Sequence, residues 1–238
     1  MSKNIGNVHS FQSLGAVDGP GIRYVVFMQG CNLRCGCCHN PDTWDATGGT
    51  PYTAQQVFEK VKRYKEYFGE NGGITVSGGE PLLWANFVKE LFTLCKKDGI
   101  NTCLDTSGSI LNDEVESLLS VTDMVLLDIK YTTCEQYKEY VGCELNTVME
   151  FLNYLNSKNI PTIIRQVIIP TLNDSDENIL KLKDIKSKYS NVEKIELLPF
   201  RKICEVKYQN LNLEFPFAKH PEPTLEVMEK LNEKLNQI

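Results

Sequence analysis

The sequence predicts an α/β fold in one domain, residues 1–238, built as a partial, open (β/α)6 barrel of parallel strands. Two patterns point to this class. Short β-branched runs alternate with longer segments that have apolar residues at helical spacing, and six such pairs follow one another. Crossover connections of this kind are right-handed and leave the strands parallel. Six pairs are too few for a closed eight-stranded barrel, and a doubly wound sheet stays open as the alternative.

The elements are predicted in chain order from local pattern. The six strands are Arg23–Met28, Ile74–Ser77, Thr102–Thr106, Met124–Ile129, Thr162–Ile169 and Lys194–Phe200. Apolar stripes predict helices, and their members are Val57, Val61, Tyr64 and Phe68, then Phe87, Leu91 and Leu94, then Ile179, Leu182 and Ile185, and last Leu225, Met228, Leu231 and Leu235. Thr53 with Gln56, and Thr147 with Glu150, fit capping boxes at helix starts. We expect the N-terminal segment, residues 1–22, to pack on or beside the barrel mouth.

The net charge, the hydropathy pattern and the cysteine content exclude several classes of protein. A net charge of -6 argues against a protein that binds duplex nucleic acid, which needs a basic face. No run reaches transmembrane length, and Met1–Gln12 lacks the apolar core of a signal peptide. We therefore expect a cytoplasmic protein whose nine cysteines are reduced. Five of them are scattered singly and are expected to be small apolar side chains that are buried or half-buried: Cys95, Cys103, Cys134, Cys143 and Cys204.

Polar motifs follow five of the predicted strands. They are the cysteine-rich run after the first strand, Ser77-Gly78-Gly79-Glu80-Pro81, Asp105-Thr106-Ser107-Gly108, Asp128-Ile129-Lys130, and Leu198-Pro199-Phe200-Arg201. A single Asp at a strand end is usually a turn or helix cap. Several motifs at carboxyl ends of parallel strands, where barrel-like sheets build active sites, favour a common site.

The cysteine-rich run indicates a metal or cluster. Cys31, Cys35 and Cys38 have the spacing C-x3-C-x2-C. Structural zinc usually takes four protein ligands, whereas three ligands leave one coordination position open for a substrate. A zinc loop in which Cys37 or His39 is the fourth ligand is the alternative.

These residues carry a resemblance to a known family. The cysteine spacing followed by Gly78-Gly79-Glu80 resembles the radical S-adenosylmethionine superfamily. A narrower group, the pyruvate formate-lyase activating enzymes, is indicated by Asp18-Gly19-Pro20-Gly21-Ile22-Arg23, Cys38-His39-Asn40-Pro41-Asp42-Thr43-Trp44, Cys103-Leu104-Asp105-Thr106, Leu127-Asp128-Ile129-Lys130 and Glu196-Leu197-Leu198-Pro199-Phe200. The likeness runs from His9 to the last helix.

The resemblance implies an enzyme of the [formate-C-acetyltransferase]-activating type, EC 1.97.1.4, in anaerobic glucose metabolism. In such enzymes three thiolates, here Cys31, Cys35 and Cys38, hold a [4Fe–4S] cluster whose open iron binds S-adenosylmethionine. Reductive cleavage of that cofactor gives a 5′-deoxyadenosyl radical, which removes a glycine Cα hydrogen from pyruvate formate-lyase. The implied electron donor is a reduced flavodoxin or ferredoxin, and the expected oligomeric state is a monomer.

The family match also implies roles for single residues. The implied cofactor-binding set is Cys37, Cys38, His39, Gly78, Gly79, Glu80, Asp105, Asp128, Ile129, Lys130 and Arg201, with Lys130 counted among the catalytic residues. Asp105, Thr106 and Asp128 are candidates for a monovalent cation. Asp18, Gly19, Pro20 and Gly21 form the expected binding loop for the peptide substrate. We further expect Gly79→Ala to weaken cofactor binding while the cluster still assembles.

Two residues depart from the family pattern. The residue before the third cysteine is typically aromatic or bulky, and here it is Cys37. After Leu198-Pro199-Phe200 the family commonly has a histidine, and here Arg201 stands there, which donates hydrogen bonds but accepts none. Both changes concern the adenosine contacts and leave the cysteine triad intact.

Three other functions are weighed against this one. An activase of another glycyl-radical enzyme is less consistent with the absence of cysteines between Cys38 and Cys95, because some of those activases insert a cysteine-rich segment there. A radical enzyme acting on a small molecule does not account for Asp18-Gly19-Pro20-Gly21. A zinc-binding structural domain has no use for Gly78-Gly79-Glu80.

Overall fold

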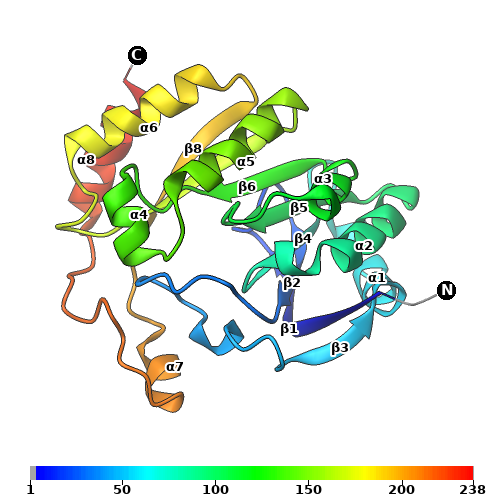
Figure 1. Ribbon diagram of the computed structural model, residues 1–238. Helices are drawn as coiled ribbons and strands as arrows, with labels where there is room; N and C mark the ends of the chain where they lie inside the picture. Colours follow the sequence, from blue (N-terminus) through cyan, green and yellow to red (C-terminus); the bar gives the residue numbers. More distant parts are fainter. Residues whose placement is uncertain (1–3, 238) are drawn as a thin grey trace. The chain divides into compact units, whose positions relative to one another are not determined.

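The computed structural model describes residues 4–237, so residues 1–3 of the predicted N-terminal segment and residue 238 lie outside the described part. The described chain forms two compact units, residues 4–32 with 43–126 and residues 33–42 with 127–237. The strand order is β3-β1-β2-β4-β5-β6-β7-β8 (Figure 1). Among the described residues, no helix is both long and apolar enough to cross a membrane.

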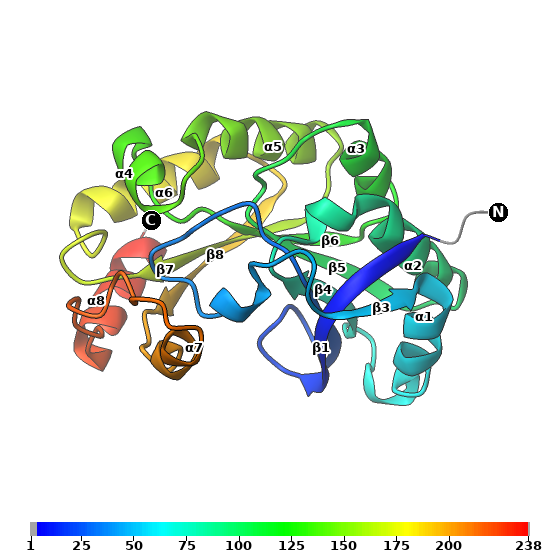
Figure 2. The ribbon, with the colours of Figure 1, turned by 60° about the horizontal axis from the view of Figure 1, so that its bottom comes forward.

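The first unit contains the N-terminal strands and three helices. In chain order its elements are β1 (Ile5–Gly15), β2 (Arg23–Met28), β3 (Thr50–Thr53), α1 (Ala54–Lys62), β4 (Gly73–Gly78), α2 (Ala85–Lys97), β5 (Asn101–Thr106), α3 (Asp113–Leu119) and the start of β6 (Met124–Asp128). The first unit also contains the short 3-10 helices η2 (Lys65–Tyr67) and η3 (Pro81–Trp84). A third one, η1 (Pro41–Thr43), has its first two residues in the second unit and its last in the first. Helix α2 packs between α1 and α3, as Figure 2 also shows.

The second unit contains the end of β6 and the C-terminal elements. These are α4 (Cys134–Tyr140), α5 (Leu145–Ser157), β7 (Thr162–Ile168), α6 (Asp176–Lys188), β8 (Val192–Pro199), α7 (Glu205–Asn210) and α8 (Leu225–Asn236). Strands β7 and β8 are parallel, and α8 packs against α6 (Figure 1).

The six predicted strands correspond to β2, β4, β5, β6, β7 and β8, with bounds that differ by at most two residues. Parallel pairing of β2 with β4 and of β4 with β5 confirms the predicted direction. The prediction does not include β1 and β3, which pair antiparallel, β1 with β2 and β3 with β1. Strand β1 is largely polar and half-exposed, so it lacks the apolar run by which the other strands are recognised.

One predicted capping box is confirmed and the other is wrong. Thr53 and Gln56 form the reciprocal capping box at the start of α1. Thr147 lies inside α5, which begins at Leu145. Glu144 occupies the N-cap position of this helix, and its side chain makes no capping hydrogen bond. The helix starts earlier because α4 ends shortly before it, where Gly142 takes a left-handed φ of 87° and turns the chain.

Candidate active site

The cysteine-rich loop follows β2 and is divided between the two units. Cys31 belongs to the first unit, and Cys35 and Cys38 belong to the second. All three are half-buried, and none of the nine cysteines forms a disulfide. Within residues 4–237 no three His, Cys, Asp or Glu side chains are gathered so that they could hold a metal ion. The assignment of the three cysteines as ligands therefore rests on their spacing in the chain.

In the first unit, the start of the loop is held against the end of β4 by backbone contacts. The amide of Glu80 donates to the carbonyl oxygen of Gly30 at 2.8 Å, and the amide of Gly79 donates to that of Met28 at 2.9 Å. A Cβ on Gly79 would lie 2.1 Å from the Gly30 oxygen, and one on Gly78, whose φ is 112°, would lie 2.2 Å from the Met28 nitrogen. Both glycines are thus required for the approach of the two backbone segments.

This close approach argues against the expectation that a side chain at Gly79 leaves the cluster site intact. Gly30 directly precedes Cys31, so a displaced Gly30 carbonyl displaces the first predicted ligand.

Glu80 is a buried carboxylate with a full set of donors. It is 1% exposed, and it caps η3 by accepting from the amide of Leu82 at 3.1 Å. Thr106 donates its hydroxyl to Glu80 at 2.6 Å, and Ser107 donates both its amide, at 3.1 Å, and its hydroxyl. Burial raises the pKa of Glu80, while the donors from Ser107, Thr106 and Leu82 oppose the rise. Glu80 therefore ties the end of β4 to the end of β5.

Asp105 lies beside this network, near the carboxyl end of β5. The hydroxyl of Ser77 donates to its carboxylate at 2.7 Å, and Asp105 is 9% exposed. The Thr106 hydroxyl donates a hydrogen bond to Glu80 and accepts one from the amide of Gly108 at 3.1 Å. Asp128 belongs to the second unit, so the predicted cation site stays a prediction.

The Asp18–Gly21 loop is anchored by Arg23, a fully buried arginine that sequence reasoning did not single out. Its guanidinium donates to the Thr75 hydroxyl at 2.7 Å, to the Pro20 carbonyl at 3.0 Å and to the Ile74 carbonyl at 2.8 Å. Thr75 in turn donates to the Asp18 carbonyl at 2.7 Å.

This loop lies on the same face of the sheet as Asp105. A Cβ on Gly19 would lie 3.3 Å from the Cys103 sulfur. Side chains two residues apart on a strand share a face, so Thr75 and Cys103 point to the same side as Ser77 and Asp105. The loop therefore contacts the amino-terminal halves of β4 and β5, one step along that face from the Ser77–Asp105 pair.

In the second unit, the remaining part of the cysteine loop turns tightly and is held by α4. The amide of Cys38 donates to the Cys35 carbonyl at 3.1 Å, and the amide of Gly36 donates to the Tyr140 carbonyl at 2.9 Å. A Cβ on Gly36 would lie 2.4 Å from the ring of Phe217, so only glycine fits beneath this ring.

Cys37 differs from its two neighbours in environment. Its side chain is 8% exposed, and burial raises the pKa of the Cys37 thiol to about 11, against a smaller opposing effect of Lys130. A thiol of this kind stays protonated at neutral pH, whereas metal ligation needs a thiolate. The environment favours the prediction that Cys37 is not a ligand.

Helix α7 holds the segment that follows Cys38. The Tyr208 hydroxyl donates to the Cys38 carbonyl at 3.2 Å. The ammonium of Lys207 donates to Asn40 at 2.8 Å and to Asp42 at 3.0 Å. Sequence reasoning did not predict α7, and the single pattern that could have indicated it is a short one, buried Cys204 and Tyr208 at helical spacing.

Asp128 and Lys130 form an ion pair at the end of β6, and Arg165 of β7 completes it. The Lys130 ammonium lies 2.5 Å from one carboxylate oxygen, and the Arg165 guanidinium lies 3.3 Å from the other. Burial by itself would raise the pKa of Asp128, but Lys130 and Arg165 lower it below the ordinary value. Ile129 between them is fully buried and donates its amide to the Arg165 carbonyl at 3.0 Å. A charged residue inside the apolar run Thr162–Ile168 is the signal that could have identified Arg165.

His39 and Arg201 meet through the backbone. A ring nitrogen of His39 lies 2.9 Å from the Arg201 carbonyl oxygen, and burial lowers the pKa of His39. The Arg201 guanidinium pairs with Glu222 at 2.9 Å and is 44% exposed. The departure from the family's histidine therefore places an ion pair at this position.

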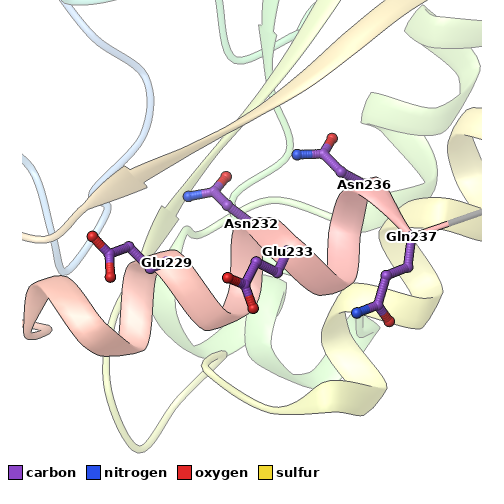
Figure 3. A pocket seen from close by; sticks show the side chains of 5 residues that line it. All are labelled: Glu229, Asn232, Glu233, Asn236 and Gln237. Carbon is purple, nitrogen blue, oxygen red and sulfur yellow. The ribbon is translucent and has the colours of Figure 1, made fainter.

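A surface pocket of about 580 Å³ lies on α8, and Figure 3 shows its lining side chains: Glu229, Asn232, Glu233, Asn236 and Gln237. Four of them lie on α8 and Gln237 directly follows it, and none belongs to the predicted site.

Known proteins that are similar to this chain point to one family. The family model described as the radical SAM superfamily matches residues 25–182. The chain is 41% identical to pyruvate formate-lyase 1-activating enzyme of Escherichia coli (strain K12), over 98% of this chain and 96% of that protein. It is 44% identical to pyruvate formate-lyase-activating enzyme of Clostridium pasteurianum, over 98% of both.

Solved structures show the same fold. SuiB of Streptococcus suis, bound to its precursor peptide SuiA, matches with a TM-score of 0.70 and 16% identity, over 88% of this chain and 44% of that chain. A domain of pyruvate-formate lyase-activating enzyme from Bacteroides vulgatus matches with a TM-score of 0.57 and 21% identity, over 69% of this chain and 92% of that one. The predicted fold class, an α/β fold with a mostly parallel sheet of the open partial-barrel type, is confirmed. The chain belongs to the radical SAM superfamily and, within it, to the family of the pyruvate formate-lyase activating enzymes.

Proposed function

We propose that this protein activates pyruvate formate-lyase by producing a glycyl radical in it. The observation that carries the proposal is 41–44% identity to activating enzymes over 96–98% of their length. The proposed cofactors are a [4Fe–4S] cluster and S-adenosylmethionine. A monovalent cation at Asp105, Thr106 and Asp128 is a further part of the proposal.

The chemistry of the three cysteines supports these cofactors. Cys31, Cys35 and Cys38 carry no disulfide and are half-buried, as ligands with one side open to a substrate should be. When bound, the cluster and S-adenosylmethionine supply the chemistry, a one-electron cleavage to methionine and a 5′-deoxyadenosyl radical that takes a hydrogen atom from a glycine Cα. The protein supplies position, charge and exclusion of water.

Residues at the ends of several strands are proposed to bind different parts of the cofactor. Gly78, Gly79 and Glu80 fix the backbone that leads into Cys31, and their amide-rich turn is the proposed site for the amino-acid end of S-adenosylmethionine. Support comes from Glu80, whose buried carboxylate lies at the same turn and complements a cationic ammonium group.

In the second unit, Lys130 and Arg165 place two cations around Asp128, so this group has net positive charge and suits a carboxylate or ribose hydroxyls. The cofactor-facing set is completed by Cys37, Cys38, His39, Ile129 and Arg201. Because the Arg201 side chain pairs with Glu222, we propose that it contributes through the carbonyl that meets His39.

The glycine-bearing peptide is proposed to bind at Asp18, Gly19, Pro20 and Gly21. Support comes from the loop's rigid anchoring by Arg23 and from its place on the sheet face that carries Asp105. A glycine hydrogen must reach near-attack distance, which a mobile loop would not secure. Asp18→Ala should reduce glycyl-radical formation and spare the slow cleavage of S-adenosylmethionine without protein substrate. Parallel loss of both, or loss of neither, would remove the peptide role from this loop.

The deciding experiment is electron paramagnetic resonance of a mixture of the anaerobically reconstituted protein, pyruvate formate-lyase, S-adenosylmethionine and a reductant. A glycyl-radical signal supports the proposal. Cleavage of S-adenosylmethionine without that signal would instead favour another glycyl-radical enzyme or a small molecule as the substrate. Zinc in the purified protein in place of iron and sulfide would contradict the proposed function. Reduced flavodoxin or ferredoxin as donor, a monomeric state and a cytoplasmic location are part of the proposal.

A further inference from the structure

Gln166 is a glutamine buried in the apolar strand β7, directly after Arg165. It is 1% exposed, and both ends of its side-chain amide are paired. Its Nε2 donates to the Ile129 carbonyl at 3.1 Å, and its Oε1 accepts from Asn178 of α6 at 2.6 Å. A buried amide is unfavourable unless it is hydrogen-bonded, and a methionine of similar volume would fill the same space without that requirement. The function proposed above gives Gln166 no part, so its amide calls for a specific explanation.

Asn178 holds the Gln166 side chain in one orientation. The Asn178 side chain is itself buried, at 5% exposure, and its nitrogen also donates to the Asn173 carbonyl at 2.8 Å. Its oxygen accepts from the Thr132 hydroxyl at 2.9 Å. Both hydrogens of this amide and its oxygen are thus paired, and a fully paired group in a buried network is held rigidly. The direction in which Gln166 donates is therefore fixed from α6.

The Ile129 carbonyl that accepts from Gln166 lies between the two charged residues at the end of β6. Ile129 is fully buried, and its amide donates to the Arg165 carbonyl at 3.0 Å. Neighbouring side chains on a strand point to opposite faces. Arg165 accordingly reaches the Asp128 carboxylate from one face of β7, at 3.3 Å. Gln166 reaches the Ile129 backbone from the other face. The backbone that carries Asp128 and Lys130 is therefore fixed on both faces of the strand.

We propose that Gln166 is a positioning residue, which places the Lys130 ammonium for the carboxylate or ribose of S-adenosylmethionine. This inference rests on the cofactor role proposed above for Lys130. Gln166 acts through the Ile129 carbonyl, one peptide bond away from Lys130. A lysine has a long and flexible stem, so the course of its backbone sets which region its ammonium reaches. Without the Gln166 amide this backbone relaxes, and the affinity for S-adenosylmethionine falls.

The test measures the Kd of S-adenosylmethionine by equilibrium dialysis with the cluster-loaded protein, in the absence of protein substrate. For Gln166→Met we expect the Kd to rise roughly five- to tenfold. The matched control is Asn191→Leu. Asn191 is a buried amide at the amino-terminal end of the same strand, where it donates to the Ile160 carbonyl at 2.9 Å and to the Thr162 hydroxyl at 3.0 Å. This control should lower the unfolding temperature as Gln166→Met does and leave the Kd unchanged.

A double-mutant cycle separates positioning from general destabilisation. Lys130→Met alone should raise the Kd. Because Gln166 acts through the Lys130 ammonium, adding Gln166→Met to Lys130→Met should raise the Kd less than about twofold further. A residue that only stabilises the fold would add its full effect in both backgrounds.

Hydrogen exchange of the cluster-free protein gives a readout that needs no cofactor. The backbone amides of residues 129–133 should exchange faster in Gln166→Met and at the original rate in Asn191→Leu. Asn178→Ala is a second variant, which keeps Gln166 but removes the donor that orients it, and it should act in the same direction with a smaller effect.

The outcomes distinguish this inference from the function on which it rests. A higher Kd in Lys130→Met with an unchanged Kd in Gln166→Met would overturn the inference alone. So would an equal rise in Asn191→Leu, additive effects in the cycle, or unchanged hydrogen exchange. An unchanged Kd in Lys130→Met would remove the cofactor role of Lys130 and this inference with it. Absence of S-adenosylmethionine binding by the unsubstituted protein would refute the proposed function itself, and the inference would fall with it.

Discussion

Gly79→Ala is the most informative single substitution because two explanations of this glycine predict different results. The added methyl group would lie 2.1 Å from the carbonyl oxygen of Gly30 and 2.7 Å from its carbonyl carbon. Both atoms belong to the backbone, so one segment has to move by about 1 Å to relieve the overlap. The movement also strains the hydrogen bond from Glu80 to Gly30.

The magnitude follows from these two effects. Overpacking in a close-packed region costs about 1–3 kcal/mol. Loss of a buried backbone hydrogen bond adds about 1–3 kcal/mol. At about 2–4 °C per kcal/mol for a chain of this size, the unfolding temperature of the cluster-free protein should fall by roughly 5–20 °C. Iron and sulfide content should fall as well, because Gly30 positions Cys31.

The assay pairs calorimetry of the cluster-free protein with iron and sulfide analysis after reconstitution. Gly99→Ala is the matched control, since Gly99 has a left-handed φ of 71° but nothing within 4 Å of its added Cβ. It should cost about 1 kcal/mol from backbone strain and leave the iron content unchanged. A stable Gly79→Ala protein with full iron content would refute the packing argument. Weakened S-adenosylmethionine binding in that same protein would show that the glycine serves the ligand.

The other predictions concern the ligand set, the buried arginine and acid sensitivity. Cys37→Ala should keep the iron content, while Ala at Cys31, Cys35 or Cys38 should abolish it; iron loss in Cys37→Ala alone would reverse the ligand assignment. Arg23→Met leaves the oxygens of Pro20, Ile74 and Thr75 without their donor, so urea titration should show a loss of about 3–5 kcal/mol, and a change below about 1 kcal/mol would contradict the anchoring role. Asp128 has a lowered pKa in the folded state, so its pairing stabilises the protein above the ordinary carboxyl pKa of about 3.9, and that stabilisation is lost as pH falls below it. Asp128→Asn should accordingly show a shallower fall in unfolding temperature on acidification, and an unchanged slope would contradict the pairing.

The sequence by itself determined the parallel strands and the order of the motifs at their ends. Apolar periodicity and strand punctuation are local properties, and they located β2, β4, β5, β6, β7 and β8 to within two residues. The cysteine spacing and its neighbouring motifs were sufficient to indicate the family. The polar strand β1 escaped because its pairing with β2, and not its own composition, makes it a strand.

Only the tertiary structure decided what the individual site residues touch. Gly79 is a glycine because of Gly30, 49 positions earlier in the chain, and Glu80 is satisfied by Thr106 and Ser107 of the next strand end. Arg165 of β7 pairs with Asp128 of β6, and the buried Tyr131 hydroxyl has no hydrogen-bond partner within the described residues. Each of these facts depends on a distance between residues remote in the chain, which local pattern does not encode. The physical reason is that propensity fixes the element, whereas packing fixes which backbone atoms, donors and charges share a volume from which water is excluded.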